Sequence, residues 1–291
     1  MKIKSVLKIG MGQLLVEGGE PERNLNRAGD MVREAATKEC DLILLPECLD
    51  LAWTHPSAKT EAQMIPGPHS DTLCSLAEIN SMYLCAGLTE RFEDKVYNAA
   101  ILINPKGEII LKYRKINVLN VAQDIYSIGQ TLSVVDTTFG IVGVNICSDN
   151  YSDSLEIGHS LARMGARIIL SPSSWTVEYS TTEDEDPYGK KWYQPYHTLA
   201  KLHDLIIISA TSVGVIVGGV YEGKKMVGCS LAVDKTGIIR QGKFNEFTGE
   251  LVVAEIKVPS PQPLGTNVGD RLNTQGYYDE SLALEFLTSQ S

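Results

Sequence analysis

The feature of this sequence that most constrains its fold is a repeated alternation of short apolar runs with longer amphipathic stretches. Residues 5–11 and 42–47 have the length and apolar character of buried strands. Between them, Pro21 stands where a first helical turn tolerates proline, and apolar residues from Leu25 to Ala36 recur on one helical face. Strands that alternate with helices predict an α/β fold.

The second half of the chain repeats this alternation. Residues 140–147 and 166–174 read as strands, and the pattern between them predicts a helix from about Ser154 to Met164 that ends before a glycine. A further helix near residues 190–203 contains Pro195, which predicts a kink or a restart.

Turn and capping signals complete the organisation of the chain. Ser70 is expected to cap a helix that runs through about residue 81, and the turns Asn104–Gly107 and Asp234–Gly237 predict hairpins. No linker, composition break or fixed-period repeat divides the sequence. We expect one domain over residues 1–291, with an extended C-terminal tail from about residue 259.

Charge argues against several classes of partner. The chain has 26 Lys and Arg against 36 Asp and Glu, a net charge of −10, and the basic residues form no patch. The longest apolar stretch, Leu205–Val220, is interrupted by hydroxyl side chains. We therefore expect neither a nucleic-acid partner nor a membrane span.

Cysteine and histidine usage predicts the compartment and argues against a metal. The N-terminus has no apolar run of signal-peptide length, so we expect a cytoplasmic protein with its six cysteines reduced. No two cysteines are spaced as CxxC, and the five histidines lack ligand spacing. The sequence therefore predicts neither a metal nor another cofactor.

Three reactive side chains follow predicted strands. Glu47, Lys115 and Cys147 each come at the end of an apolar or β-branched run, where ligands gather in α/β architectures. A carboxylate that accepts the thiol proton and an ammonium that stabilises negative charge are sufficient to make a cysteine nucleophilic. Each residue alone is more often structural: a lone cysteine is usually a small buried hydrophobe, and the other two usually lie on the surface.

The segments that carry these residues, LILLPE, YRK and NICSD, resemble the three signatures of the nitrilase superfamily, the carbon–nitrogen hydrolases, in that family's order. The similarity extends through GLTER, YNAAILINPKGEIILKYRK and GCSLAVDKTGII to about residue 257. It implies a four-layer α-β-β-α sandwich that assembles as a homodimer or higher homo-oligomer. It also implies a small-molecule amide or nitrile as the substrate.

The resemblance also implies the roles of single residues. Cys147 is expected to attack the substrate carbon and form a thioester, with Glu47 as general base and then general acid. Lys115 and the backbone N–H of Ser148 are expected to stabilise the oxyanion. The predicted enzyme is an amidase-type hydrolase with a Glu-Lys-Cys triad that releases ammonia or an amine.

Two departures from the family pattern leave the substrate open. Many family amidases read C-Y-D-x-R-F-P-E after the strand, where this chain reads CSDNYSDS, and the C-W-E of nitrile-hydrolysing members is also absent. Family amidases commonly carry a second glutamate after the lysine, and here the nearest acid before Gly129 is Asp124. Either Asp124 replaces that glutamate or the second acid is missing.

Candidates for the substrate pocket are Asn150, Tyr151, Trp175 and Trp53. Ordinary packing is the alternative for each of them, and for Trp53 it fits at least as well. The acidic run at residues 183–186 reads as a solvated loop; if it overhangs the site, it favours a cationic or neutral substrate. The leading interpretation is hydrolysis of a small linear amide or N-carbamoyl compound. A nitrilase, an amide-forming acyl transferase and a catalytically silent scaffold or binding protein are the alternatives.

Overall fold

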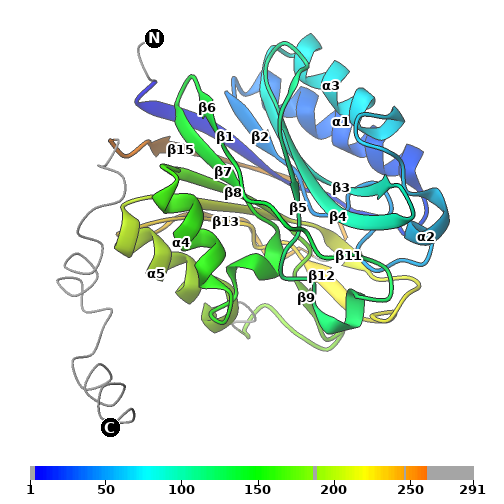
Figure 1. Ribbon diagram of the computed structural model, residues 1–291. Helices are drawn as coiled ribbons and strands as arrows, with labels where there is room; N and C mark the ends of the chain where they lie inside the picture. Colours follow the sequence, from blue (N-terminus) through cyan, green and yellow to red (C-terminus); the bar gives the residue numbers. More distant parts are fainter. Residues whose placement is uncertain (1–3, 186–188, 246, 261–291) are drawn as a thin grey trace, which may run out of the picture.

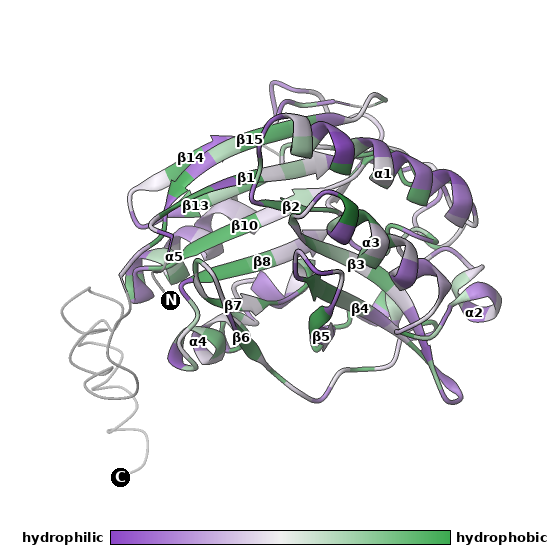
Figure 2. Cartoon of the chain, turned by 90° about the horizontal axis from the view of Figure 1, so that it is seen from above, coloured by the Kyte–Doolittle hydropathy of each residue, from purple (hydrophilic) through white to green (hydrophobic). Residues whose placement is uncertain are grey.

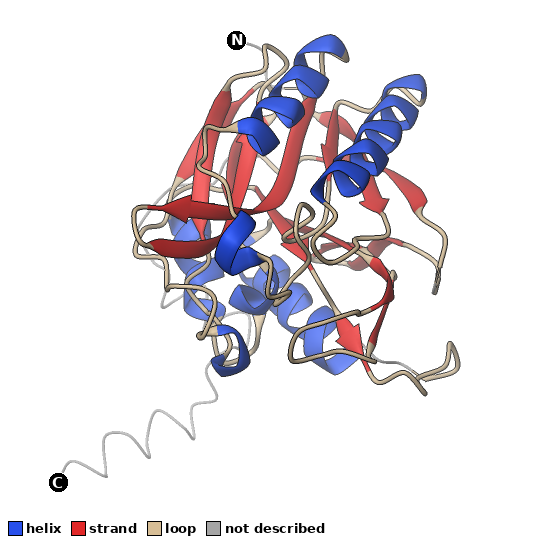
Figure 3. Cartoon of the chain, turned by 90° about the vertical axis from the view of Figure 1, so that its right-hand side faces the viewer, coloured by secondary structure: helices blue, strands red, loops and turns tan. Residues whose placement is uncertain are grey.

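The computed structural model describes residues 4–260 apart from 186–188 and 246. Two six-stranded sheets pack face to face, and helices cover the outer face of each sheet (Figures 1 and 3). The architecture is the predicted four-layer α-β-β-α sandwich. The tail predicted from about residue 259 lies, beyond residue 260, outside the described residues.

The first sheet has three parallel central strands and antiparallel strands on either side. In spatial order its strands are β15 (Glu250–Lys257), β1 (Val6–Gln13), β2 (Leu42–Leu44), β3 (Tyr83–Phe92), β4 (Lys95–Ile103) and β5 (Ile109–Arg114). The parallel strands are buried on both faces, which explains their continuous apolar runs.

The second sheet has the same plan, with parallel strands in its centre and antiparallel strands at its edges. Its strands are β14 (Gly237–Gln241), β13 (Leu231–Asp234), β10 (Ile206–Thr211), β8 (Ile168–Ser173), β7 (Gly140–Val144) and β6 (Val134–Thr137). A small third sheet is formed by β11 (Val213–Val215), β12 (Lys225–Val227) and β9 (Thr176–Val177).

Helices α1 (Pro21–Thr37) and α3 (Pro68–Ile79) cover the first sheet, and α4 (Leu155–Arg163) and α5 (Gln194–His203) cover the second (Figure 1). The short helix α2 (Ala58–Glu61) lies in the connection between β2 and α3. Figure 2 shows hydrophilic residues on the outer side of α1 and apolar residues along the strands.

Two helix predictions are refined by the structure. Helix α3 begins at Pro68, two residues before Ser70, which was the expected cap. Ser70 lies inside the first turn instead, where its hydroxyl accepts the N–H of Gly67. The helix near residues 190–203 restarts as expected: a π-helical turn at Gly189–Tyr193 leads into α5, which has a proline in its first turn.

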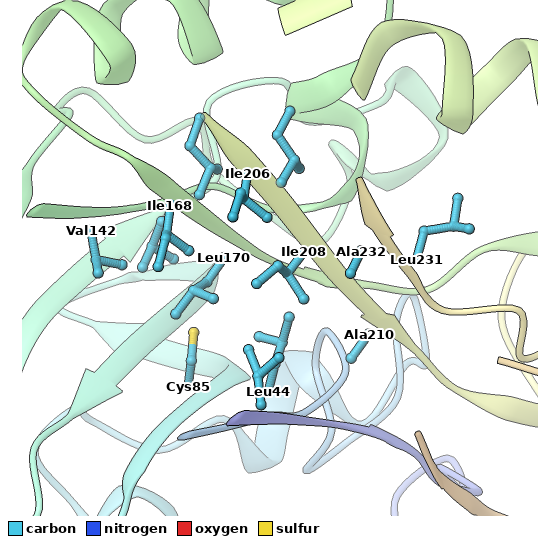
Figure 4. Close-up of a cluster of buried hydrophobic side chains, with 14 of the residues drawn as sticks. Leu44, Cys85, Val142, Ile168, Leu170, Ile206, Ile208, Ala210, Leu231 and Ala232 are labelled. Carbon is cyan, nitrogen blue, oxygen red and sulfur yellow. The ribbon is translucent and has the colours of Figure 1, made fainter. Parts of the chain in front are cut away.

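The main core lies between the two sheets. Figure 4 shows Leu44 and Cys85 of the first sheet facing Leu170 and Ile208 of the second. Alternate residues of β2 point the other way, so that Ile43 packs under α1 and α3. The sheets are therefore held together by apolar side chains, and the polar residues that follow their strands are brought to one end of the sandwich.

Candidate active site

Glu47 lies three residues after β2, on a loop between the two sheets. Its backbone N–H donates to the carbonyl of Ser173 at the end of β8 over 3.3 Å. Strand β3 passes so close that a Cβ on Gly87 would stand 2.5 Å from the Glu47 Cα, so only glycine fits there. The glutamate is completely buried.

Lys115 follows β5 directly. Its N–H donates to the carbonyl of Asn98 and its carbonyl accepts the N–H of Gly129, both over 2.8 Å. A Cβ on Gly129 would lie 2.0 Å from the carbonyl oxygen of Arg114, which explains the glycine. The lysine is 2% exposed, and its backbone is held from both sides.

Cys147 begins a 3₁₀ turn (Cys147–Asn150) after β7, with φ at +48°. A non-glycine residue in the left-handed region is strained, and a sharp strand-to-helix turn presents its side chain at the end of the sheet. The backbone N–H of Cys147 donates to the hydroxyl of Ser171 over 3.2 Å. The turn gives the thiol a fixed position.

The carboxylate of Glu47 accepts two hydrogen bonds on one oxygen. Lys115 Nζ donates to Oε1 over 2.7 Å, and Asn98 Nδ2 donates to the same atom over 2.6 Å. Oε2 is buried and has no hydrogen-bond partner among the described residues. The arrangement holds an ionised pair and leaves one carboxylate oxygen available to a reacting proton.

The electrostatics of the site favour a neutral thiol beside a protonated lysine. Burial, and after it the charge of Glu47, raises the pKa of Cys147 to about 12, although Lys115 and the backbone of Ser174 lower it. Burial lowers the pKa of Lys115, but the negative charge of Glu47 outweighs it; Cys147, once it ionises at high pH, and Asp149 raise the pKa further. These shifts place the three predicted catalytic residues within electrostatic reach of one another.

Asp149 ties the lysine segment to the cysteine turn. Its buried carboxylate accepts the hydroxyl of Tyr113 over 2.7 Å, the N–H of Asn117 over 2.7 Å and the N–H of Ile146 over 2.8 Å. Ser148 is the residue whose backbone N–H is the predicted oxyanion donor. Its side-chain hydroxyl donates to the carbonyl of Asn117 over 2.8 Å. The backbones on either side of the site are therefore cross-linked by buried hydrogen bonds.

A cavity of about 490 Å³ opens onto Cys147. Of the four predicted pocket residues, Tyr151 and Trp53 line it. Each belongs to an aromatic pair: Tyr151 lies 4.9 Å from Trp192 and Trp53 lies 5.3 Å from Tyr221, between ring centroids. Two aromatic pairs thus line the cavity. The sequence predicted Tyr151 of one pair and Trp53 of the other.

Asn150 and Trp175 are not among the residues that line this cavity. The Asn150 amide donates to Asn145 and Ser171 over 2.9 Å each, so it supports the turn that carries the cysteine. Trp175 is completely buried and stacks on Trp192 at 4.7 Å between ring centroids. Trp192, and not Trp175, lines the cavity.

Asp124 is exposed, on the turn that follows the 3₁₀ turn Asn120–Ala122. Lys115, in contrast, is buried, so the structure does not bring these two side chains together. The second polar side chain on the Glu47 carboxylate is the amide of Asn98, which the sequence analysis did not single out. Its signal was a polar residue in the middle of the apolar strand VYNAAILI.

One residue of the acidic run predicted at 183–186 reaches the site. Glu185, which the structure describes, lines the cavity together with Thr181, Glu178 and two lysines. Glu183, Asp184 and Glu185 are exposed, as a solvated loop predicts, and lysines lie near Glu185 along the cavity wall. Neither lysine could be predicted from the sequence: Lys191 lies on the π-helical turn and Lys224 on a loop, and neither place has a periodicity that indicates where a side chain points.

Comparison with known proteins identifies the class to which this fold and site belong. The family model described as carbon-nitrogen hydrolase matches residues 8–264. The chain therefore belongs to the carbon-nitrogen hydrolase family of enzymes, as the signature segments predicted.

Two relatives show what kinds of enzyme this chain is similar to. The chain is 29% identical over 180 residues to "Omega-amidase NIT2-A" of Xenopus laevis, covering 58% of this chain and 64% of the relative. It is 31% identical over 180 residues to a "Nitrilase" of Pyrococcus abyssi, covering 60% and 68%. The matched region thus spans slightly less than two thirds of the amidase relative's length.

Solved structures share the fold. A double mutant of the amidase from Nesterenkonia sp. AN1 in complex with acrylamide superposes with a TM-score of 0.75 at 15% identity, covering 94% of this chain and 97% of the other. Nit3 of Saccharomyces cerevisiae gives 0.74 at 23% identity, covering 88% and 92%. The sandwich predicted from sequence is therefore confirmed.

Across the described residues, none of the helices combines the length and apolarity needed to cross a bilayer.

Proposed function

We propose that this protein hydrolyses a small linear amide or N-carbamoyl compound through a thioester on Cys147. One observation carries the proposal: the buried Lys115–Glu47 pair has one carboxylate oxygen without a hydrogen-bond partner among the described residues, and the charge of Glu47 acts on a thiol held at a strained turn. A neutral thiol, a fixed base and a fixed cation are the parts that acyl transfer through sulfur requires.

In the proposed reaction, the Cys147 sulfur attacks the carbonyl carbon as its proton passes to Glu47 Oε2. Lys115, together with the backbone N–H of Ser148, stabilises the oxyanion. Glu47 then gives the proton to the departing nitrogen, the carbon–nitrogen bond breaks, and ammonia or an amine leaves. A water molecule attacks the thioester with Glu47 as base, which releases the carboxylic acid and restores the thiol.

Amide hydrolysis is favoured over nitrile hydrolysis as the first activity to test. Both a named amidase and a named nitrilase are among the relatives. The serine after Cys147 replaces the tryptophan expected of nitrile-hydrolysing members, which favours the amide. A homo-oligomer and a cytoplasmic location stay predictions, and light scattering of the purified protein tests the first of them.

The experiment is ammonia release from a panel of small amides, carbamoyl compounds and nitriles, with Cys147→Ala beside the wild type and intact mass followed for an adduct. Release that needs Cys147, with an acyl adduct of matching mass, supports the proposal. An adduct that accumulates without release indicates an acceptor other than water. If no compound of the panel gives either ammonia release or an adduct, the result counts against hydrolysis and favours a silent binding protein.

A further inference from the structure

The loop that follows Glu47 is strained at three places. Cys48, Ala52 and Thr54 have φ angles of +45°, +67° and +62°. None of them is glycine, and a side chain is disfavoured in this left-handed region, so such residues persist only where their surroundings hold them. Residues 48–54 therefore need a fixed partner, because the first of them is bonded directly to the residue that we propose as the base.

One phenol oxygen contacts both ends of this loop. Tyr126 is 1% exposed, and its oxygen accepts the thiol of Cys48 over 3.7 Å and the backbone N–H of Thr54 over 3.2 Å. Burial raises the pKa of Tyr126 and that of Cys48 well above their ordinary values. Both groups therefore stay neutral beside Glu47, and the contact adds no charge to the site.

Tyr126 is itself held by the segment that follows Lys115. The next residue, Ser127, donates its backbone N–H to the carbonyl of Val96 on β4, and Gly129 donates to the carbonyl of Lys115, both over 2.8 Å. These bonds fix the backbone on which the phenol stands. Tyr126 thus joins the lysine segment to the loop of the glutamate.

We propose that Tyr126 is a positioning residue: it holds the strained loop 48–54, and through that loop the carboxylate of Glu47, in the orientation that accepts the thiol proton. This inference rests on the proposed function and adds a residue to it. Tyr126 is not among the described residues that line the cavity, so we expect it to act through the backbone of the loop. Asn98 holds the same carboxylate from its other end, by a direct hydrogen bond.

The test removes the phenol oxygen and keeps the ring. In Tyr126→Phe, the two groups that now donate to this oxygen lose their acceptor, so kcat for the best amide should fall about 10-fold while KM changes less than about twofold. Tyr83→Phe is the matched control, because the Tyr83 oxygen also accepts a backbone N–H, that of Thr138 over 3.4 Å, at the start of β3. An unchanged kcat in Tyr126→Phe, or an equal fall in Tyr83→Phe, overturns the assignment.

Relief of the strain provides a rescue that separates positioning from general stability. Glycine adopts a positive φ freely, so Ala52→Gly lowers the tendency of the loop to leave this conformation, and in the Tyr126→Phe background it should restore kcat by about threefold or more. Glu39→Gly is its control, because Glu39 has a φ of +55° on the exposed connection after α1. If both glycines restore kcat equally, or if neither restores it, the loss does not come from this loop and the assignment is overturned.

Amide hydrogen exchange tests the loop without any turnover. In Tyr126→Phe, residues 48–54 should exchange about 10-fold faster than in the wild type, while β1 and β3 should exchange as before. Faster exchange in these residues, while neither protein hydrolyses an amide, would keep the hold of Tyr126 on the loop and refute the hydrolase. Hydrolysis with the same kcat and the same exchange in both proteins would keep the hydrolase and refute the role of Tyr126.

Discussion

Asn98 and Glu47 are joined by a 2.6 Å hydrogen bond from the side-chain amide Nδ2 to Oε1. Lys115 donates to the same oxygen, so both strong donors act on one side of the carboxylate. The orientation that results keeps Oε2 free of hydrogen-bond partners among the described residues. We infer that Asn98 is a positioning residue, because it fixes which oxygen of Glu47 is available as the base.

Replacing Asn98 with alanine should lower kcat about 10-fold to 100-fold with little change in KM, since a hydrogen bond to a charged group is lost. Thr89→Val is the matched control. Thr89 pairs with Asn98 across the sheet and is as deeply buried, but it has no hydrogen bond to Glu47. Steady-state kinetics and thermal unfolding should be measured together. Activity losses that simply follow stability in both variants would contradict the positioning role.

Lys115→Met should affect both catalysis and stability. Loss of the predicted oxyanion donor should cost about 3 kcal/mol in the chemical step. It also leaves Glu47 buried beside a single neutral donor, which should destabilise the fold by about 3–5 kcal/mol. Urea unfolding and kcat for the best amide measure the two effects, with Lys106→Met in the exposed hairpin turn as control. A change confined to KM would refute the oxyanion role.

The thiol of Cys147 should be neutral in the resting enzyme at pH 8. Burial and Glu47 raise its pKa from 9.0 to about 12. A raised pKa means that the folded state holds the proton more tightly than the unfolded chain. The associated stabilisation is therefore complete below pH 9 and lost as pH rises towards 12.

The ultraviolet difference spectrum between the wild type and Cys147→Ala measures this directly, because only a thiolate adds absorbance. We expect no thiolate band at pH 8 and its growth only in strongly alkaline solution. A band already present at neutral pH would show a preformed ion pair, and general-base transfer to Glu47 would then be the wrong description of the first step.

The predictable part of this site came from strand ends. An apolar run that stops at a polar residue indicates where a parallel strand ends, and the carboxyl ends of such strands meet in α/β folds. Glu47 and Cys147 follow that rule. Lys115 follows β5, an antiparallel edge strand that runs in the same direction as β2, and the structure brings all three within electrostatic reach. The local pattern nominated them, and the resemblance of LILLPE, YRK and NICSD to the family signatures implied their roles.

The remaining residues depend on partners distant in sequence. Asn98 reaches Glu47 across 51 positions, and only the pairing order of β2, β3 and β4 brings them together. Trp175 and Trp192 are both tryptophans and their rings stack on each other, yet Trp192 lines the cavity and Trp175 lies behind it. Periodicity carries no information of this kind.

The last prediction concerns Asp149, whose carboxylate accepts hydrogen bonds from both the lysine segment and the cysteine turn. In Asp149→Asn, an amide NH2 replaces one of the two carboxylate oxygens, so at least one of the groups that now donate to Asp149 loses its acceptor and faces another donor. We expect a loss of about 2–3 kcal/mol in the free energy of unfolding, and lower activity even where the variant is fully folded. Tyr113→Phe, which removes one donor, should cost about 1 kcal/mol. Asp136→Asn, exposed on β6, should cost almost nothing. If Asp149→Asn unfolds like Asp136→Asn, or keeps full activity, the carboxylate does not link the lysine segment to the cysteine turn.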